Sequence, residues 1–239
     1  MQVTRMNAHS HSPASAEIGH FIALVESALL PHWQLQSTDE HEPVEVAALP
    51  APWQLLGCGN YAAVVCHPDH PGLVVKRYAP GRPGLAEEAG VYARLGDHPA
   101  YSAALHVGAD YLILRRIYGK TLWQCCLDGT PITRQCIADI DAAMAWAAER
   151  QLNPHDVHAK NVMQHEGRGY IVDISDFYKT GPCQRWSDFR KVYDYLYAPL
   201  LLDDPVPLPL WLMNGLRRCY RKLRKILAQA GNWDSIHSK

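Results

Sequence analysis

The sequence lacks the features that mark membrane, secreted and nucleic-acid-binding proteins. No apolar run approaches the roughly 18 residues that a membrane-spanning helix needs. Residues 1–17 do not combine a charged start, an apolar core and small cleavage residues, so we expect no secretory signal. The formal net charge is −1, which gives no overall bias towards nucleic acid.

Cysteine pairs with the spacing of a metal site are also missing. The seven cysteines are an odd number, none belongs to a C-x-x-C pattern, and Cys125 and Cys126 are adjacent. Adjacent cysteines have poor geometry for a structural disulfide. We therefore expect reduced thiols, buried in the core of a protein from a cytosol-like compartment.

What is present is enough apolar material for one domain or two small lobes: 239 residues, 48% of them hydrophobic. Residues 1–16 are polar and are predicted to be a disordered tail. Apolar residues at a helical period predict a helix over residues 18–30, and Pro31 is expected to end it. Residues 34–52 are polar, acidic and contain proline, which indicates a linker or a strand edge.

The most informative stretch is residues 154–177. Asp156 is followed five residues later by Asn161, and after a polar turn an apolar strand, Tyr170–Val172, runs into Asp173. One carboxylate can accept the proton of an incoming hydroxyl, while an amide oxygen and a second carboxylate can hold Mg²⁺ on nucleotide phosphates. We therefore predict that Asp156 is catalytic and that Asn161 and Asp173 are metal ligands.

A second stretch, residues 55–78, is predicted to be a β-hairpin that contacts a nucleotide. Gly57 and Gly59 let the backbone approach phosphates closely, and Val64 follows on the first strand. Lys76 lies on the otherwise apolar second strand and needs an anionic partner there, because an unpaired buried ammonium is costly. A lysine on an edge strand that points to water is the alternative interpretation. The glycines at this distance upstream favour phosphate contact.

A helix predicted over residues 83–95 supplies a partner for this lysine. Glu88 shares a face with Val91, Tyr92 and Leu95, so we expect it to pair with Lys76, whereas Glu87 lies on the wetter side. Two solvated glutamates in the first turn of a helix are the alternative.

The remaining elements connect and support these stretches. The strand Tyr111–Leu114 leads into a turn with Gly119, and this connector, including Leu114 and Arg116, is predicted to contact the adenine ring. Amphipathic helices are predicted over residues 132–151 and 186–202, the second with Phe189, Val192, Tyr193 and Leu196 on its apolar face, and over 210–231 with a strongly basic side.

In this order the parts resemble the protein-kinase-like fold over about residues 53–200. The resemblance implies an α+β, bilobal fold with a small β-rich N-lobe and a reduced, mostly helical C-lobe. It divides the chain into a tail (1–16), an N-terminal helix and linker (17–52), an N-lobe (53–114), a C-lobe with a basic C-terminal helix (115–230) and a second tail (231–239). It makes Lys76, with Glu88, the residue that contacts the α- and β-phosphates of ATP, and Asp188 a support for the catalytic loop.

The chain departs from the family's usual pattern at several positions. Pro154 stands where the family has a histidine, and Ile174-Ser175 replaces Phe-Gly after the metal-binding Asp. His158 and Asp176 are similar to residues of aminoglycoside-phosphotransferase-like kinases, which makes Asp176 a rival metal ligand. The short segment before Asp188 leaves no room for a long activation segment, as in compact bacterial effector kinases.

The predicted function is ATP- and Mg²⁺-dependent phosphotransfer to a protein serine or threonine hydroxyl, in the cytoplasm or after delivery into a host cell as an effector. One alternative keeps the chemistry but uses a small hydroxylated acceptor, such as a sugar, an antibiotic or a lipopolysaccharide core. Another is a pseudokinase that only binds partners, which the joint presence of Lys76, Asp156, Asn161 and Asp173 argues against. No nucleic-acid partner is expected. The basic C-terminal helix is a candidate for contact with an acidic partner or an anionic membrane.

Overall fold

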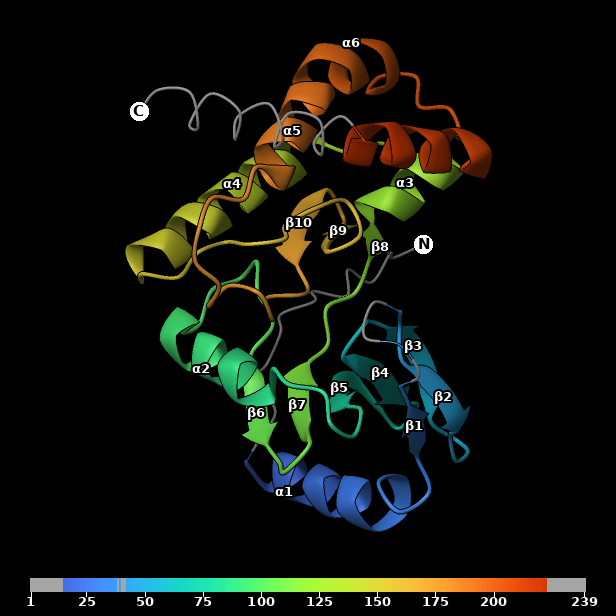
Figure 1. The fold of residues 1–239 in the computed structure, drawn as a ribbon, viewed down its shortest axis with the longest axis vertical. Helices are drawn as coiled ribbons and strands as arrows, with labels where there is room; N and C mark the ends of the chain where they lie inside the picture. Colours follow the sequence, from blue (N-terminus) through green and yellow to red (C-terminus); the bar gives the residue numbers. More distant parts are fainter. Residues whose placement is uncertain (1–14, 38, 40–41, 223–239) are drawn as a thin grey trace, which may run out of the picture. The chain divides into compact units, whose positions relative to one another are not determined.

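The structure is a computed structural model that describes residues 15–37, 39 and 42–222. The chain divides into two compact units. Unit 1 runs up to His98 and includes Ser102–Ile117, and unit 2 holds Pro99–Tyr101 and the chain from Tyr118 onward. Unit 1 contains most of the strands and unit 2 most of the helices, so the fold is α+β with a β-sheet N-terminal region, as predicted (Figure 1). The two predicted tails lie mostly or wholly outside the described residues.

Unit 1 is built on a five-stranded antiparallel sheet in the order β3-β4-β5-β7-β6. The elements are helix α1 (Ser15–Leu24), its π-helical continuation η1 (Val25–Leu29), β1 (Gln34–Gln36), β2 (Glu45–Ala48), β3 (Gln54–Cys58), β4 (Ala62–His67), β5 (His70–Tyr78), helix α2 (Leu85–Leu95), β6 (Ala104–Val107) and β7 (Tyr111–Arg115). The second half of the predicted hairpin is β4–β5, and its turn is tighter than expected because β5 already begins at His70. The first strand was predicted to begin at Gly57, but a turn at Gly59 divides it into β3 and β4, which pair with each other.

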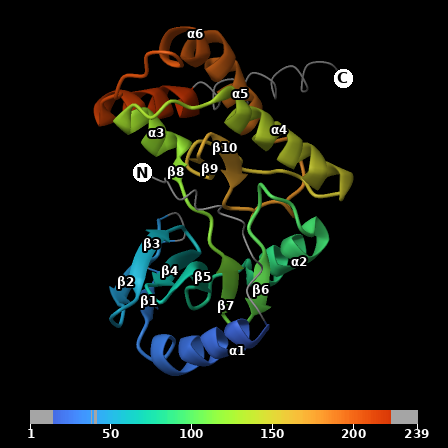
Figure 2. The ribbon, with the colours of Figure 1, turned by 180° about the vertical axis from the view of Figure 1, so that it is seen from behind.

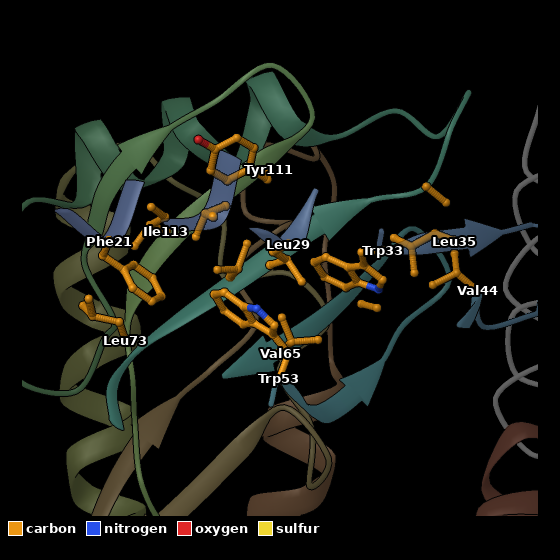
Figure 3. Packing of buried hydrophobic residues seen from close by; sticks show 14 residues of the cluster. Phe21, Leu29, Trp33, Leu35, Val44, Trp53, Val65, Leu73, Tyr111 and Ile113 are labelled. Carbon is orange, nitrogen blue, oxygen red and sulfur yellow. The ribbon is translucent and has the colours of Figure 1, made fainter. Parts of the chain in front are cut away.

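One face of this sheet packs against the N-terminal helix. Strand alternation points Val65, Val75 and Ile113 to the same side, where Phe21 and Leu29 of α1–η1 cover them, and all five side chains are fully buried (Figure 3). The opposite face is therefore the one that remains for α2 and the predicted site.

The segment for which the sequence left open a linker or a strand edge contributes to this core. Strands β1 and β2 pair as a separate hairpin, and Leu35 and Val44 from this segment join the buried cluster with Trp33 (Figure 3). The hairpin is short, so the alternation that reveals a strand in a sequence spans too few residues to be recognised.

Unit 2 combines helices with a three-stranded antiparallel sheet in the order β10-β9-β8. Its elements are β8 (Lys120–Thr121), α3 (Leu122–Asp128), α4 (Arg134–Glu149), β9 (Val162–His165), β10 (Arg168–Ile171), α5 (Arg185–Val192), the π-helical η2 (Tyr193–Tyr197), α6 (Ala198–Leu201) and a helix over residues 210–222. Both views show α4 alongside the β9–β10 hairpin (Figures 1 and 2). The remainder of the helix predicted to reach residue 231 lies outside the described residues.

The helix predicted over residues 186–202 is present, but its apolar face is only partly correct. Tyr193 is buried, whereas Val192 and Leu196 are 54% and 56% exposed, and Trp186 is buried instead. The π-helical geometry of η2 changes the number of residues per turn. The 3.6-residue period used for the prediction therefore fails in this part of the helix.

All seven cysteines are free, and the predicted core position is correct for Cys66, Cys125, Cys126 and Cys136. It is wrong for Cys58 and Cys219, which are exposed. Among the described residues, no helix has the length and apolar character needed to cross a bilayer.

Candidate functional site

The predicted nucleotide-contacting residues of unit 1 share one face of its sheet. Val64 on β4 pairs with Lys76 on β5, and Lys76 pairs with Leu112 on β7, so their side chains form one row. Gly57 pairs with Val64 at the start of this row, and Leu114 lies two residues from Leu112, on the same side. Since α1 covers the other face, these residues lie on the side that meets α2.

Lys76 pairs with Glu88, the partner that the helical spacing predicts. The Lys76 Nζ lies 2.9 Å from Oε1 and 2.7 Å from Oε2 of Glu88. The Glu88 side chain is 0% exposed and the Lys76 side chain 12% exposed. Glu87, in contrast, is exposed. A buried carboxylate needs such a partner, because an isolated charge in the protein interior is costly.

A third member of this cluster is Tyr78, which the sequence analysis missed. Its hydroxyl donates a hydrogen bond to Oε2 of Glu88. The signal was available: residues 76 and 78 of one strand point to the same face, so both can reach the same carboxylate.

The backbone of Gly59 is already engaged within unit 1. Its N–H donates to the Ala62 carbonyl at 2.8 Å, which closes the turn between β3 and β4, and its carbonyl accepts from the Val44 N–H at 2.9 Å. Gly57, in β3, has open space where a side chain would begin. Close approach of a ligand therefore fits Gly57 better than the N–H of Gly59.

The connector residues also have backbone partners in unit 1. The Arg116 N–H donates to the Gly72 carbonyl at 2.8 Å, and the Arg115 carbonyl accepts from the Ser102 hydroxyl at 2.6 Å. Leu114 pairs with Val74 and Ala104 in the sheet. Contact of Leu114 and Arg116 with adenine stays a prediction. It would have to be made by their side chains or by other atoms of the connector.

In unit 2, hydrogen bonds join Asp156, Asn161 and the segment that ends at Asp173 into one compact loop. The Asn161 side-chain N–H donates to the Asp156 carbonyl at 3.2 Å, and the Asn161 carbonyl accepts from the Val172 N–H at 3.0 Å. Asp156 has a φ of 63°, an uncommon left-handed conformation for a residue other than glycine. Such conformations occur often at functional sites, where surrounding contacts hold them.

The Asp156 carboxylate lies beside two nitrogen-bearing side chains. Arg185 donates a hydrogen bond to Oδ1, and Nε2 of His158 is 3.7 Å from the same oxygen. Burial raises the pKa of Asp156, and the carboxylates of Asp176 and Asp173 add to this, while His158 and Arg185 oppose it. Burial also lowers the pKa of His158. Arg185 had no signal in the sequence, because it comes from a distant helix without a motif.

Asn161 and Asp173 carry oxygen atoms of the kind that bind a magnesium ion. The amide N–H of Asn161 is directed at Asp156, which leaves its amide oxygen as the ligand atom. Mg²⁺ is commonly bound by one or two protein oxygen donors together with substrate phosphates and waters. Within the described ranges, no cluster of three or more His, Cys, Asp or Glu side chains forms a self-sufficient metal site.

Asp176, the rival metal ligand, has a cationic neighbour. Its Oδ1 is 2.7 Å from the Lys179 Nζ, and its Oδ2 is 3.9 Å from Nδ1 of His155.

Asp188, expected to support the catalytic loop, accepts a hydrogen bond from the Tyr220 hydroxyl at 2.9 Å. The contact with Tyr220 ties α5 to the helix over residues 210–222.

Comparison with known proteins gives a relative among kinases. No family model matches the sequence. The chain is 28% identical over 122 residues to a Bacillus subtilis (strain 168) protein named "Putative serine/threonine-protein kinase YrzF". The match covers 51% of this chain and 57% of that protein, so the chain spans little more than half of its relative's length.

Solved structures similar to this chain include two forms of the PknI kinase domain of Mycobacterium tuberculosis. A single mutant is 23% identical, with a TM-score of 0.40 over 52% of this chain and 60% of that domain. A double mutant is 22% identical, with a TM-score of 0.40 over 55% and 61% of the two chains.

Proposed function

We propose that this chain is a protein-kinase-like, ATP-dependent phosphotransferase whose acceptor is a serine or threonine hydroxyl of a protein. A relative that it matches carries the name "Putative serine/threonine-protein kinase YrzF", which supports this acceptor class. The observation that carries the proposal is the hydrogen-bonded loop that joins Asp156, Asn161 and the residue before Asp173.

The proposed roles follow from the chemistry of these side chains. Asp156 orients the acceptor hydroxyl and takes its proton as the hydroxyl oxygen attacks the γ-phosphorus. Its partial burial next to Asp173 and Asp176 makes it a stronger base than an exposed aspartate. Asn161 and Asp173 hold Mg²⁺, which supplies positive charge to the nucleotide phosphates when it is bound.

In unit 1, the role proposed for Lys76 is to contact the α- and β-phosphates. A lysine side chain is flexible, and it must be held in one orientation to place its charge. The buried carboxylate of Glu88 does this, since both of its oxygens lie within 3 Å of the lysine nitrogen. Glu88 thus acts through Lys76 and does not contact the nucleotide itself.

Substitution of Asp156 by alanine tests the proposal. The variant should lose phosphate transfer while it keeps nucleotide affinity, because Asp156 acts on the acceptor and Lys76 binds the phosphates. Nucleotide binding is measured by titration calorimetry, and transfer is followed with labelled ATP and a protein acceptor mixture. Transfer by the variant near the wild-type rate would contradict the assignment. Transfer by the wild type to a small hydroxylated compound alone would replace the protein acceptor with a small-molecule one.

A further inference from the structure

The two oxygens of the Asp156 carboxylate have different surroundings. Oδ1 accepts a hydrogen bond from Nη1 of Arg185 and lies 3.7 Å from Nε2 of His158. In the part of the chain that the structure describes, no hydrogen bond reaches Oδ2. A carboxylate with one oxygen held and the other available has a defined orientation, whereas one without partners rotates about its terminal bond.

The imidazole of His158 is itself oriented by the loop. Its Nδ1 accepts a hydrogen bond from the Lys160 backbone N–H at 3.2 Å. In the neutral ring the proton is then on Nε2, the nitrogen nearest to Oδ1 of Asp156. Arg185 and His158 thus both present N–H groups to Oδ1. Of these two groups, only that of Arg185 is within hydrogen-bonding distance.

The backbone of Arg185 is anchored to the rest of unit 2 by its neighbour in α5. It is the first residue of α5, and the next residue, Trp186, is buried and donates a hydrogen bond to Asp141 on α4 at 2.7 Å. The same segment holds the Asp156 backbone, since the Asp156 N–H donates to Sγ of Cys183 at 3.3 Å. The segment that follows the predicted metal ligand Asp173 therefore contacts both the main chain and the side chain of Asp156.

We propose that Arg185 is a positioning residue that holds Oδ1 of Asp156, so that Oδ2 is the oxygen that receives the proton of the acceptor hydroxyl. This role rests on the proposed phosphotransferase function. The acceptor oxygen forms a bond to the γ-phosphorus, and the bond from that phosphorus to the bridging oxygen breaks. ADP leaves with the bonding electrons, and the hydroxyl proton moves to Oδ2.

The exposure of Arg185 separates this role from a purely structural one. Its side chain is 50% exposed, and ion pairs at that exposure contribute little to stability. Loss of the guanidinium should therefore reduce turnover much more than it reduces folding stability. Truncation of Arg185 to alanine also leaves a solvent-accessible gap, which a small guanidinium ion can enter.

The test compares Arg185→Ala and Arg185→Lys with wild type and with Asp156→Ala. For Arg185→Ala we expect kcat to fall by about 10- to 100-fold, the loss associated with a misplaced catalytic group, with KM for ATP unchanged. Added guanidinium chloride should restore part of the lost rate, and an equal concentration of ammonium chloride should not, because only guanidinium has the planar shape and the N–H donors of the lost group. The lysine variant should be intermediate.

The matched control is Arg190→Ala, which removes an arginine from the same helix that pairs with Asp141 and Asp194. It should keep the wild-type rate and show no response to guanidinium. Thermal unfolding confirms that each variant is folded. A wild-type rate in Arg185→Ala, or a rate loss that guanidinium does not restore in a folded variant, would overturn the role of Arg185 alone. A wild-type protein that transfers no phosphate would overturn the proposed function, and this role with it.

Discussion

At the scale of single residues, Glu88 is the side chain whose environment is most demanding in unit 1. It is fully buried, and both of its oxygens accept hydrogen bonds, from Lys76 and from Tyr78. Removing one partner of a buried ion pair is far more harmful than removing an exposed charge, because the other charge stays buried without compensation.

Replacement of Glu88 by alanine should therefore lower the free energy of unfolding by about 3–5 kcal/mol, measured by urea denaturation. Tyr78→Phe should cost about 1 kcal/mol, since it removes one hydrogen bond and keeps the ion pair. Glu87→Ala, one position away on the exposed side, is the control and should stay within about 0.5 kcal/mol of wild type. Equal losses in the two glutamate variants would contradict the description of this cluster.

The same residues show what the sequence can and cannot reveal. The pair of Lys76 and Glu88 followed from local periodicity, a lysine on an apolar strand and a glutamate on the apolar face of a helix. Arg185 could not be found in this way, because its partner Asp156 lies 29 positions away and nothing in the local pattern of either residue specifies the contact.

At the scale of elements, the contact between β10 and α4 depends on the absence of a side chain. A Cβ at Gly169 would lie 2.3 Å from the backbone oxygen of Cys136 on α4. A backbone atom at that distance cannot move aside as a side chain can. The close packing of the β9–β10 hairpin on α4, next to the predicted catalytic loop, therefore requires glycine at this position.

Gly169→Ala should lower the free energy of unfolding by about 1–3 kcal/mol, the usual cost of overpacking, with the upper part of the range expected because the obstacle is backbone. Gly215→Ala is the matched control in the same unit. It has open space around its Cβ position and lies in a helix, so alanine should stabilise it by up to about 1 kcal/mol. Chemical denaturation of both variants tests this account, and a neutral Gly169→Ala would refute it.

Elements with a regular period were predictable, and those with a local irregularity were not. Helix α4 and strand β5 lie close to the ranges that the sequence predicted, whereas the predicted strand before β5 is divided into β3 and β4. The apolar face of α5–α6 was partly wrong because η2 interrupts the α-helical period. The short β1–β2 hairpin offered too few residues for a recognisable alternation.

At the scale of the whole molecule, the response to acid follows from carboxylates with strong partners. Burial alone would raise the pKa of Asp139, but hydrogen bonds from Arg168, the Gly169 N–H and Gln135 outweigh it and lower this pKa below its usual value of 3.8. The hydrogen bond from Lys120 and a second from Thr130 lower the pKa of Asp128 to about 2. Both carboxylates are therefore harder to protonate in the folded state than in the unfolded state.

A lowered folded-state pKa contributes stability above the unfolded value of 3.8, and this contribution is lost as pH falls through the folded value. The free energy of unfolding, measured with urea from pH 6 down to pH 2, should fall most steeply below about pH 4. Asp139→Asn should flatten this decrease, whereas Asp204→Asn, at an exposed position, should leave it unchanged. An acid profile identical for wild type and Asp139→Asn would show that Asp139 is not held as described.

Transfer of phosphate from ATP by this chain can be followed with labelled nucleotide. The purified protein is incubated with γ-labelled ATP and Mg²⁺, alone and with bacterial or eukaryotic lysate, beside an Asp173→Ala variant. We expect label on protein bands with wild type and none with the variant, because Asp173 is a proposed ligand of the metal. Nucleotide binding without label on any protein or small hydroxylated acceptor would contradict it, and so would equal labelling by the Asp173 variant.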